Sequence, residues 1–204
     1  MDTALARQRV AAHGVGTSGE GMGMGNDAGP DPDPLAAAPG IRTARPADLD
    51  SILVMIRELA DYEKLSHAVL FDRAVMDRHL FGERPYAEVL IAESHDRSGA
   101  ATTVGFALFF HSFSTFVGMP GIYLEDLFVR PEARGQGIGK RLLTWLAQTT
   151  IERDCGRLEW SVLDWNEPSI GFYRSLGAVL KDEWQGFRLT GDALQALAGT
   201  HGRL

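Results

Sequence analysis

Several features that mark specialised classes of protein are scarce or absent in this sequence. The chain of 204 residues has one cysteine, Cys155, so an intrachain disulfide framework is excluded and a reducing compartment is favoured. Apolar runs stay short of the roughly 20 residues that a membrane helix needs, and the first residues lack the apolar core of a secretory signal. We therefore expect a cytoplasmic protein with no membrane partner.

Signals for metal and nucleic-acid binding are also missing. The six histidines have no metal-ligand spacing, so we expect no metal. Cys155 stands at the end of a predicted helix without a histidine nearby in sequence, which favours an inert thiol over a catalytic one. A formal net charge of −7 argues against nucleic-acid binding, for which a basic surface is typical. The same charge suits a cationic substrate, but it also serves solubility alone.

The first 40 residues differ in kind from the rest. Residues 14–29 are rich in glycine, alternating Pro and Asp follow at 30–34, and the segment has no aromatic residue. Such a sequence buries too little apolar surface to offset the entropy lost on ordering. We predict a disordered tail over residues 1–40 and one folded domain over 41–204, in line with the chain's length and its hydrophobic content of 45%.

Beyond residue 40 the hydrophobic pattern alternates between strand and helix. Helices are predicted over residues 49–61, 72–80, about 138 to 154, 166–177 and from 192. Strands are predicted over residues 41–44, 88–93, 103–110, 121–129 and 158–163, with a last strand pair over 178–181 and 186–190. This order predicts an α/β fold with a mixed, mostly antiparallel central sheet flanked by helices on both faces. The aromatic stretch 106–116 fits a core strand first and a subunit interface second.

Three glycines at alternate positions stand between the fourth predicted strand and the long helix. Gly135, Gly137 and Gly139 expose backbone N–H groups at a helix N-terminus, where the helix dipole attracts anions. Arg134 and Lys140 add positive charge. The spacing does not fit the nucleotide-triphosphate loop, and Lys140 occupies the position at which a dinucleotide-binding fingerprint needs its third glycine. We predict a phosphate-binding turn, with a glycine-rich surface turn as the alternative.

Two adjacent carboxylates, Glu125 and Asp126, lie inside an otherwise apolar predicted strand. Burial of ionised groups is unfavourable unless they are paired or solvated. Because successive strand residues face opposite sides of a sheet, we expect the two acids to have different roles, one of them in a cleft leading to the glycines. An ordinary salt bridge or a sheet-edge position is the alternative for each. Tyr173, two turns into a helix capped by Asn166, would by spacing alone pack in the core.

Three motifs occur in one order along the chain: Tyr123 to Asp126, Arg134 to Gly139, and Trp165 to Ile170 followed by Phe172 and Tyr173. Together with residues 56–63 they resemble the GCN5-related N-acetyltransferases (GNAT), in particular the diamine (spermidine/spermine) N1-acetyltransferase and thialysine N-acetyltransferase branch. The similarity covers about residues 41–190. Several motifs that agree in order are far more specific than any one of them.

This resemblance implies direct transfer of an acetyl group from acetyl-CoA to a primary amine of a small cationic acceptor, by a homodimeric enzyme. Glu125 is the implied base that takes a proton from the acceptor, and Tyr173 the implied acid that protonates the leaving thiolate. The implied coenzyme-binding residues are Leu127, Phe128, Val129, Arg134, Gly135, Gln136, Gly137, Ile138, Gly139, Lys140, Asn166 and Tyr173. The implied substrate-binding residues are Tyr62, Glu63, Glu125 and Asp126.

One departure from the branch concerns the acceptor. Gln185 and Phe187 stand where the polyamine enzymes are expected to have Glu and Trp, so a partner for a second ammonium is missing. A diamine, a polyamine, a thialysine-like amino acid and another lysine-like side chain therefore stay open as acceptors. Two rival functions also stay open: a non-catalytic CoA-binding sensor on the same fold, and a protein or peptide N-acetyltransferase. The latter needs a wide groove, whereas Tyr62 and Glu63 favour a small enclosed site.

Overall fold

The computed structural model describes residues 40–96, 98–182 and 184–199. The predicted disordered tail lies outside these residues except for Gly40, which begins the first strand, so the tail stays a prediction. Within the described residues, no helix combines the length and apolar character needed to cross a lipid bilayer.

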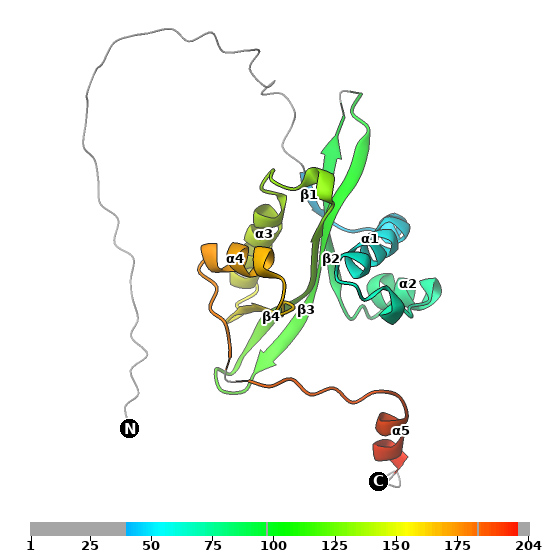
Figure 1. Cartoon of the computed structure of the whole chain (residues 1–204), viewed down its shortest axis with the longest axis vertical. Helices are drawn as coiled ribbons and strands as arrows, with labels where there is room; N and C mark the ends of the chain where they lie inside the picture. The colour runs from blue at the N-terminus through cyan, green and yellow to red at the C-terminus, as the bar shows by residue number, and fades with distance from the viewer. Residues whose placement is uncertain (1–39, 97, 183, 200–204) are drawn as a thin grey trace, which may run out of the picture. The chain divides into compact units, whose positions relative to one another are not determined.

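Five strands form one sheet, and their order in the sheet is their order in the chain (Figure 1). They are β1 (Gly40–Thr43), β2 (Glu88–His95), β3 (Ala101–Ser114), β4 (Met119–Val129) and β5 (Leu158–Trp160). The first four pair antiparallel, and β5 adds to β4 in parallel. The predicted mixed, mostly antiparallel sheet is confirmed.

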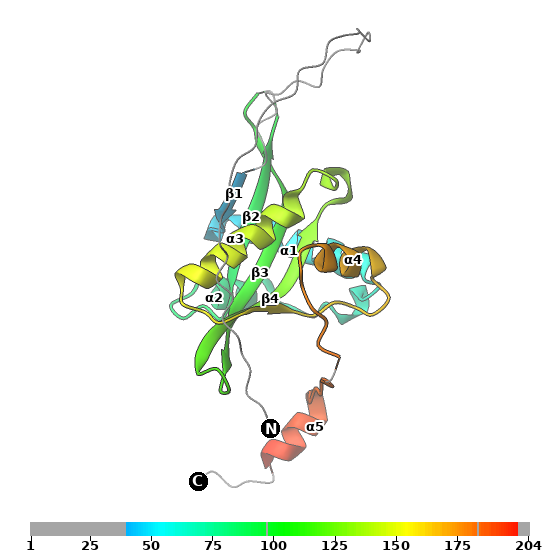
Figure 2. The same cartoon turned by 90° about the vertical axis from the view of Figure 1, so that its left-hand side faces the viewer.

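Helices cover both faces of the sheet, as predicted (Figures 1 and 2). One face carries α1 (Leu49–Tyr62) and α2 (Arg73–Phe81), and the opposite face carries α3 (Ile138–Glu152) and α4 (Glu167–Ser175). The last helix of the described chain is α5 (Gly191–Gly199). Short 3-10 helices occupy Pro46–Asp48 (η1), Ser66–Ala68 (η2) and Pro131–Ala133 (η3).

Each face of the sheet has its own apolar core, because the strand side chains alternate between the two faces. On the α1 face, the buried side chains of α1 recur at helical spacing and pack against Ile91, Phe106 and Phe128. On the α3 face, Leu142 and Leu146 pack against Phe109 and Leu124. Much of the aromatic stretch 106–116 is therefore core strand, the first of the two interpretations.

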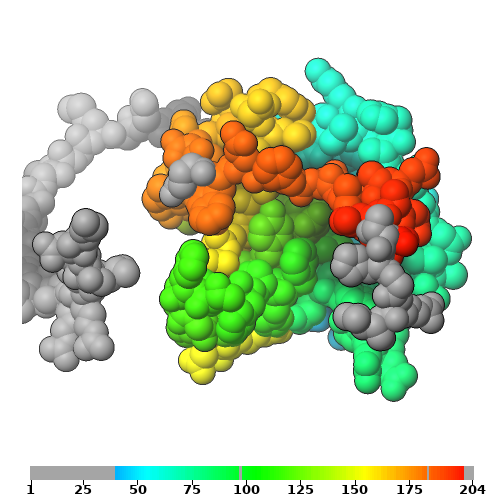
Figure 3. All heavy atoms as spheres, turned by 90° about the horizontal axis from the view of Figure 1, so that it is seen from below, coloured from blue at the N-terminus to red at the C-terminus, as the bar shows by residue number. Residues whose placement is uncertain are grey.

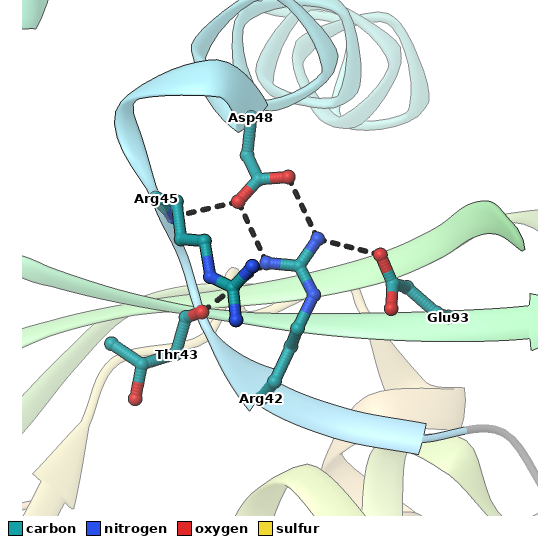
Figure 4. A network of polar contacts seen from close by, with 5 residues as sticks. All are labelled: Arg42, Thr43, Arg45, Asp48 and Glu93. Atoms are coloured by element: carbon teal, nitrogen blue, oxygen red, sulfur yellow. Dashed lines mark hydrogen bonds and ion pairs between the residues drawn. The ribbon is translucent and has the colours of Figure 1, made fainter.

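A polar network fastens the start of the domain to the sheet (Figure 4). The Arg42 guanidinium on β1 donates two hydrogen bonds of 2.7 Å to the Asp48 carboxylate in η1 and a third to Glu93 on β2. Asp48 also accepts the Arg45 backbone N–H at 2.6 Å. These hydrogen bonds from Arg42 lower the pKa of Asp48 and of Glu93, because they favour the ionised carboxylates. The network joins the entry of α1 to the first two strands.

The predicted last strand pair over 178–181 and 186–190 is wrong, since the structure assigns no strand to the described residues there. Among the described residues these segments have no buried side on which a strand could pack, because Val179 is 87% exposed and Phe187 is 94% exposed. The fifth strand is also shorter than the predicted 158–163. It pairs with β4 only from Ile122 to Leu124, where β4 changes course.

Candidate active site

A cavity of about 430 Å³ lies beside the point where β4 and β5 stop pairing, and residues of both strands' continuations form part of its wall. Four parts of the chain form its wall: the end of α1, the second half of β4, the glycine turn with the start of α3, and the segment after β5 with α4. Ligand sites commonly occupy such a place, where neighbouring parallel strands diverge at their carboxyl ends.

A β-bulge in β4 sets which side chains face the cavity. Leu108 of β3 pairs with Asp126 and Phe109 pairs with Leu124, so Glu125 is left without a partner in the register. Before the bulge Leu124 packs on the α3 face, whereas two residues beyond Asp126 the buried Phe128 packs on the α1 face. The extra residue thus reverses the alternation. It places Asp126 on the α1 face and leaves Glu125 exposed at the bend.

Three carboxylates meet in the cavity wall, namely Glu63 at the end of α1 and the pair Glu125 and Asp126 on β4. Burial raises the pKa of Asp126 to about 6, and the negative charges of Glu125 and Glu63 add to the increase. Burial also raises the pKa of Glu63. Among the described residues, no cation forms an ion pair with any of the three. For Glu125 and Asp126, the alternative of an ordinary salt bridge therefore does not hold among the described residues.

Tyr173 of α4 lines the same cavity. Its ring packs against Trp160 of β5 and the neighbouring Phe172, with ring centroids 5.1 and 5.4 Å apart. The spacing argument for a packed tyrosine is thus confirmed for the ring. Burial, followed by the charges of Glu63 and Tyr62, raises the pKa of the Tyr173 hydroxyl to about 12. At neutral pH the hydroxyl therefore keeps its proton and can donate it.

A polar bridge crosses the cavity from α1 to α4. The Tyr62 hydroxyl donates to Asn166 Oδ1 at 3.3 Å, although the two residues lie 104 positions apart in the sequence. Asn166 is buried, and the same oxygen accepts the Ser169 N–H, which caps α4 as predicted. The Arg134 guanidinium lies 4.9 Å from the centroid of the Tyr62 ring, and its Nε donates to the Val129 carbonyl at 2.9 Å. Arg134 therefore contacts both β4 and α1 in the cavity wall.

The backbone of the glycine turn adopts conformations that favour glycine. Gly135 and Gly137 have φ angles of +78° and +74°, in the left-handed region that favours glycine. Gly137 is the N-cap of α3, so the unpaired N–H groups of the first helical turn lie beside the cavity. Gly139, already helical, leaves ordinary van der Waals room, since a Cβ there would lie 3.8 Å from the Phe172 ring.

The structure brings nearly all the predicted site residues into one cavity wall. The predicted residues that line it are Tyr62, Glu63, Glu125, Asp126, Leu127, Phe128, Val129, Arg134, Gly135, Gly137, Ile138, Gly139, Lys140, Asn166 and Tyr173. Gln136 is not among them. The lining residues that sequence reasoning missed are Leu59, Ala133, Ser161, Val162, Pro168, Ser169 and Phe172. The parallel pairing of β4 and β5 is the signal for Ser161 and Val162, which follow the carboxyl end of β5.

No group of three or more His, Cys, Asp or Glu side chains in the described part of the chain could hold a metal ion. Cys155 lies beyond the end of α3, half-buried, with its Sγ atom 3.7 Å from the Arg153 carbonyl oxygen, and it is not part of the cavity wall. The polar groups of the cavity wall include three acids, the hydroxyls of Tyr62 and Tyr173, and the N–H groups of the glycine turn.

Comparison with known proteins agrees with this arrangement. The family model described as "Acetyltransferase (GNAT) family" matches residues 55–178. The chain is 41% identical to thialysine N-epsilon-acetyltransferase of Bos taurus over 165 residues, which is 78% of this chain and 96% of the relative. It is 32% identical to an L-ornithine N5-acetyltransferase of Arabidopsis thaliana over 197 residues, 77% of this chain and 86% of the relative.

Among solved structures, an integron cassette protein from the mobile metagenome of V. cholerae is similar with a TM-score of 0.64 and 30% identity, covering 79% of this chain and 98% of that one. An aminoglycoside acetyltransferase from a soil metagenome shares the fold with a TM-score of 0.63 at 19% identity. The matched region contains the bulged strand, the glycine turn and Tyr173. The chain belongs to the acetyltransferase (GNAT) family and is an N-acetyltransferase.

Proposed function

We propose that the protein transfers an acetyl group from acetyl-CoA to a primary amine of a small cationic acceptor by direct attack. The observation that carries the proposal is that one cavity joins a glycine turn suited to phosphates with a group of unpaired acids suited to an amine. Tyr173 lies in the wall of the same cavity. The glycine turn thus suits the negative diphosphate of the coenzyme, and the acids suit the positive ammonium of the acceptor.

The coenzyme occupies the end formed by the glycine turn. The N–H groups from Gly135 to Lys140 hold its diphosphate, and the dipole of α3 adds attraction for the negative charge. The part of β4 after the bulge has lost β5 as a neighbour, so its backbone groups on that edge, apart from the Val129 carbonyl that accepts from Arg134, are available to the pantetheine arm. Asn166, on the opposite wall, lies within reach of the same arm.

The acceptor occupies the acidic end. A free alkylamine has a pKa near ~10.4, so it arrives as an ammonium and must lose a proton before it attacks. Glu63 and the carboxylates of β4 attract the cation, and one of the β4 carboxylates takes the proton; the family resemblance favours Glu125. A backbone N–H in the segment Leu127–Val129 donates to the oxyanion that forms on the thioester carbonyl. Tyr173 then protonates the sulfur as the C–S bond breaks.

The size of the cavity and the names of the relatives support one class of acceptor. The cavity holds about 430 Å³ and is bridged by Tyr62 and Asn166, which suits a small molecule better than a peptide. Relatives at 41% and 32% identity are named for thialysine and ornithine, both amino acids with a side-chain amine. Together with Gln185 in place of the expected Glu, this supports a lysine-like amino acid or a short diamine ahead of a long polyamine.

Release of free thiol from acetyl-CoA tests the proposal. We expect thiol release to require a small amine, with thialysine, ornithine and short diamines as the best acceptors and lysine-containing peptides as poor ones. Mass spectrometry of the product must show an added acetyl group. A protein that binds CoA but releases thiol with none of these amines would be a sensor, and preference for peptides would support the protein acetyltransferase.

We also propose that the enzyme is a homodimer, and its cytoplasmic location stays a prediction. Support comes from apolar side chains that are exposed in the segment that follows α4, at the end of β3 and in the turn between β3 and β4; these regions reach the surface in Figure 3. The exposed residues are Phe113, Phe116, Val117, Val179, Leu180, Trp184, Phe187 and Leu189. Exposed apolar surface of this extent is typical of an interface.

Light scattering after gel filtration tests the dimer. We expect twice the 22.3 kDa mass of one chain for the wild type. The double variant Phe116→Ser, Phe187→Ser should shift the equilibrium toward the monomer, because both side chains are more than nine-tenths exposed in the single chain and lose apolar area that a partner would bury. The matched variant Asp192→Ser on α5 should stay dimeric. A monomeric wild type at micromolar concentration would rule out the homodimer.

A further inference from the structure

We propose that Asp126, rather than its neighbour Glu125, accepts the proton from the acceptor's ammonium. This inference rests on the function proposed above, whose chemistry needs a base in the acidic end of the cavity. It differs from the assignment that the family resemblance favours. Three observations carry it. The β4 bulge makes the two acids face different sides, no cation pairs with the Asp126 carboxylate among the described residues, and Asp126 is surrounded by buried and negatively charged groups.

The bulge separates the two carboxylates in space. Asp126 is paired with Leu108 of β3 and shares the α1 face with the buried Phe128, so its backbone position is held by the sheet. Glu125 has no partner in the register and is exposed. A proton acceptor must be held within hydrogen-bond reach of the reacting nitrogen. A short side chain on a paired strand meets that requirement better than a long one at an unpaired bend.

No cation among the described residues competes for the Asp126 carboxylate. The cations in the cavity wall are Arg134 and Lys140. Arg134 already donates to the Val129 carbonyl and lies over the Tyr62 ring. A carboxylate paired with a guanidinium would be a weaker base, as Glu88 illustrates: hydrogen bonds from Arg153 lower the pKa of its carboxyl. Asp126 is thus free to interact with the ammonium of the acceptor.

The surroundings also make Asp126 a stronger base than an exposed aspartate. The titratable groups in the same wall are Glu125 of β4, Tyr62 of α1, Glu63 directly after α1, Tyr173 of α4, and the two cations Arg134 and Lys140. Burial comes first among the causes that raise the pKa of Asp126 to about 6, followed by the charges of Glu125 and Glu63. At pH 7 such a group is about nine-tenths ionised, yet it holds a proton far better than a carboxyl with a pKa near ~3.9.

The step balances with the groups present. One N–H bond of the acceptor ammonium breaks, and its proton goes to a carboxylate oxygen of Asp126. The freed lone pair of the amine attacks the thioester carbon, the C–S bond breaks, and the thiolate takes the proton of Tyr173. The nitrogen of the new amide loses its second proton to water, Asp126 releases its proton to water, and the tyrosinate regains one. No metal ion or redox partner is required.

The pH dependence of kcat/KM for the acceptor, at saturating acetyl-CoA, distinguishes the two carboxylates. Below pH 9 the acceptor is almost entirely ammonium, so the acidic limb of the profile reports the enzyme's base. We expect a wild-type limb with an apparent pKa near 6. Asp126→Asn should remove this limb and lower kcat at least about tenfold, with CoA affinity retained.

In Glu125→Gln the acidic limb of the pH profile is expected to move in a specific direction, toward lower pH. Loss of the Glu125 charge lowers the pKa of Asp126, so the limb should persist and move to lower pH, while KM for the cationic acceptor rises. Loss of the limb in Glu125→Gln, together with a wild-type limb in Asp126→Asn, would assign the base to Glu125 and overturn the inference. Asp77→Asn on α2, outside the cavity wall, is the matched control and should behave like the wild type.

A second measurement does not depend on turnover. Carboxyl ¹³C NMR of the wild type should show a resonance that titrates near pH 6 and is missing from Asp126→Asn. If no such resonance exists, the inference fails even though acetyl transfer is observed. If the wild type acetylates no amine at all, the proposed function fails, and this assignment falls with it. If transfer occurs and only the variant pattern is reversed, the function stands and the inference alone is wrong.

Discussion

Tyr173→Phe is expected to lower kcat by about 10²- to 10⁴-fold, the range typical of a lost general acid. The phenylalanine ring keeps the contacts that Tyr173 makes with Trp160 and Phe172, so the position of α4 should be preserved. What disappears is the hydroxyl, whose pKa of about 12 keeps it protonated and ready to donate throughout the neutral range. The thiolate of coenzyme A would then leave without a proton from the enzyme.

Three measurements separate this role from a structural one. CoA affinity by calorimetry should stay within about twofold, and the melting temperature should stay close to the wild-type value, because only a hydroxyl without a hydrogen bond to any described residue is removed. Tyr86→Phe is the matched control: Tyr86 is 75% exposed and lies outside the cavity wall, so its turnover should be unchanged. Wild-type kcat in Tyr173→Phe would remove Tyr173 from the mechanism.

The fold was predictable where local pattern and packing agree. The apolar residues of α1 recur at helical spacing, and Asp72 and Asn166 stand at the N-caps that the sequence predicts for α2 and α4. The predicted strands over 178–181 and 186–190 are absent from the described residues. Apolar residues show only that a segment could pack in a sheet, and the exposure of Val179 and Phe187 shows that these two segments do not pack against the described residues.

The parts of the site that consist of short sequence motifs could be predicted from the sequence. The glycine turn and the adjacent acids were found because their residue types stand out from the surrounding apolar strand. The bulge at Glu125 was not foreseen, since one unpaired residue changes the facing of every later side chain without changing the composition. The contact between Tyr62 and Asn166 was also out of reach, because only the tertiary fold joins residues 104 positions apart.

A double variant of the glycine turn, Gly135→Ala with Gly137→Ala, is expected to weaken CoA binding by about 100-fold. Both glycines have left-handed φ angles, +78° and +74°, which cost an alanine about 1–2 kcal/mol each. A Cβ at either position meets no atom within 4 Å, so there is no clash to disrupt the fold. The turn can relieve the strain only by rotating its peptides, and rotation turns the N–H groups away from the diphosphate. If the two substitutions together remove about 2.8 kcal/mol of binding free energy, the affinity for CoA falls by about 100-fold.

Gly139→Ala is the matched comparison within the same turn. Its backbone is helical, and its Cβ would make an ordinary contact 3.8 Å from the Phe172 ring, so CoA affinity should stay within about threefold of the wild type. Calorimetric titration of all three proteins with CoA gives the affinities, and circular dichroism confirms that each variant is folded. Equal affinity of the double variant and the wild type would show that the diphosphate lies elsewhere, because a strained turn cannot hold a ligand as well as a relaxed one. A loss confined to the double variant would assign the diphosphate to the N-terminus of α3 and fix the direction in which the thioester points toward the acids of β4.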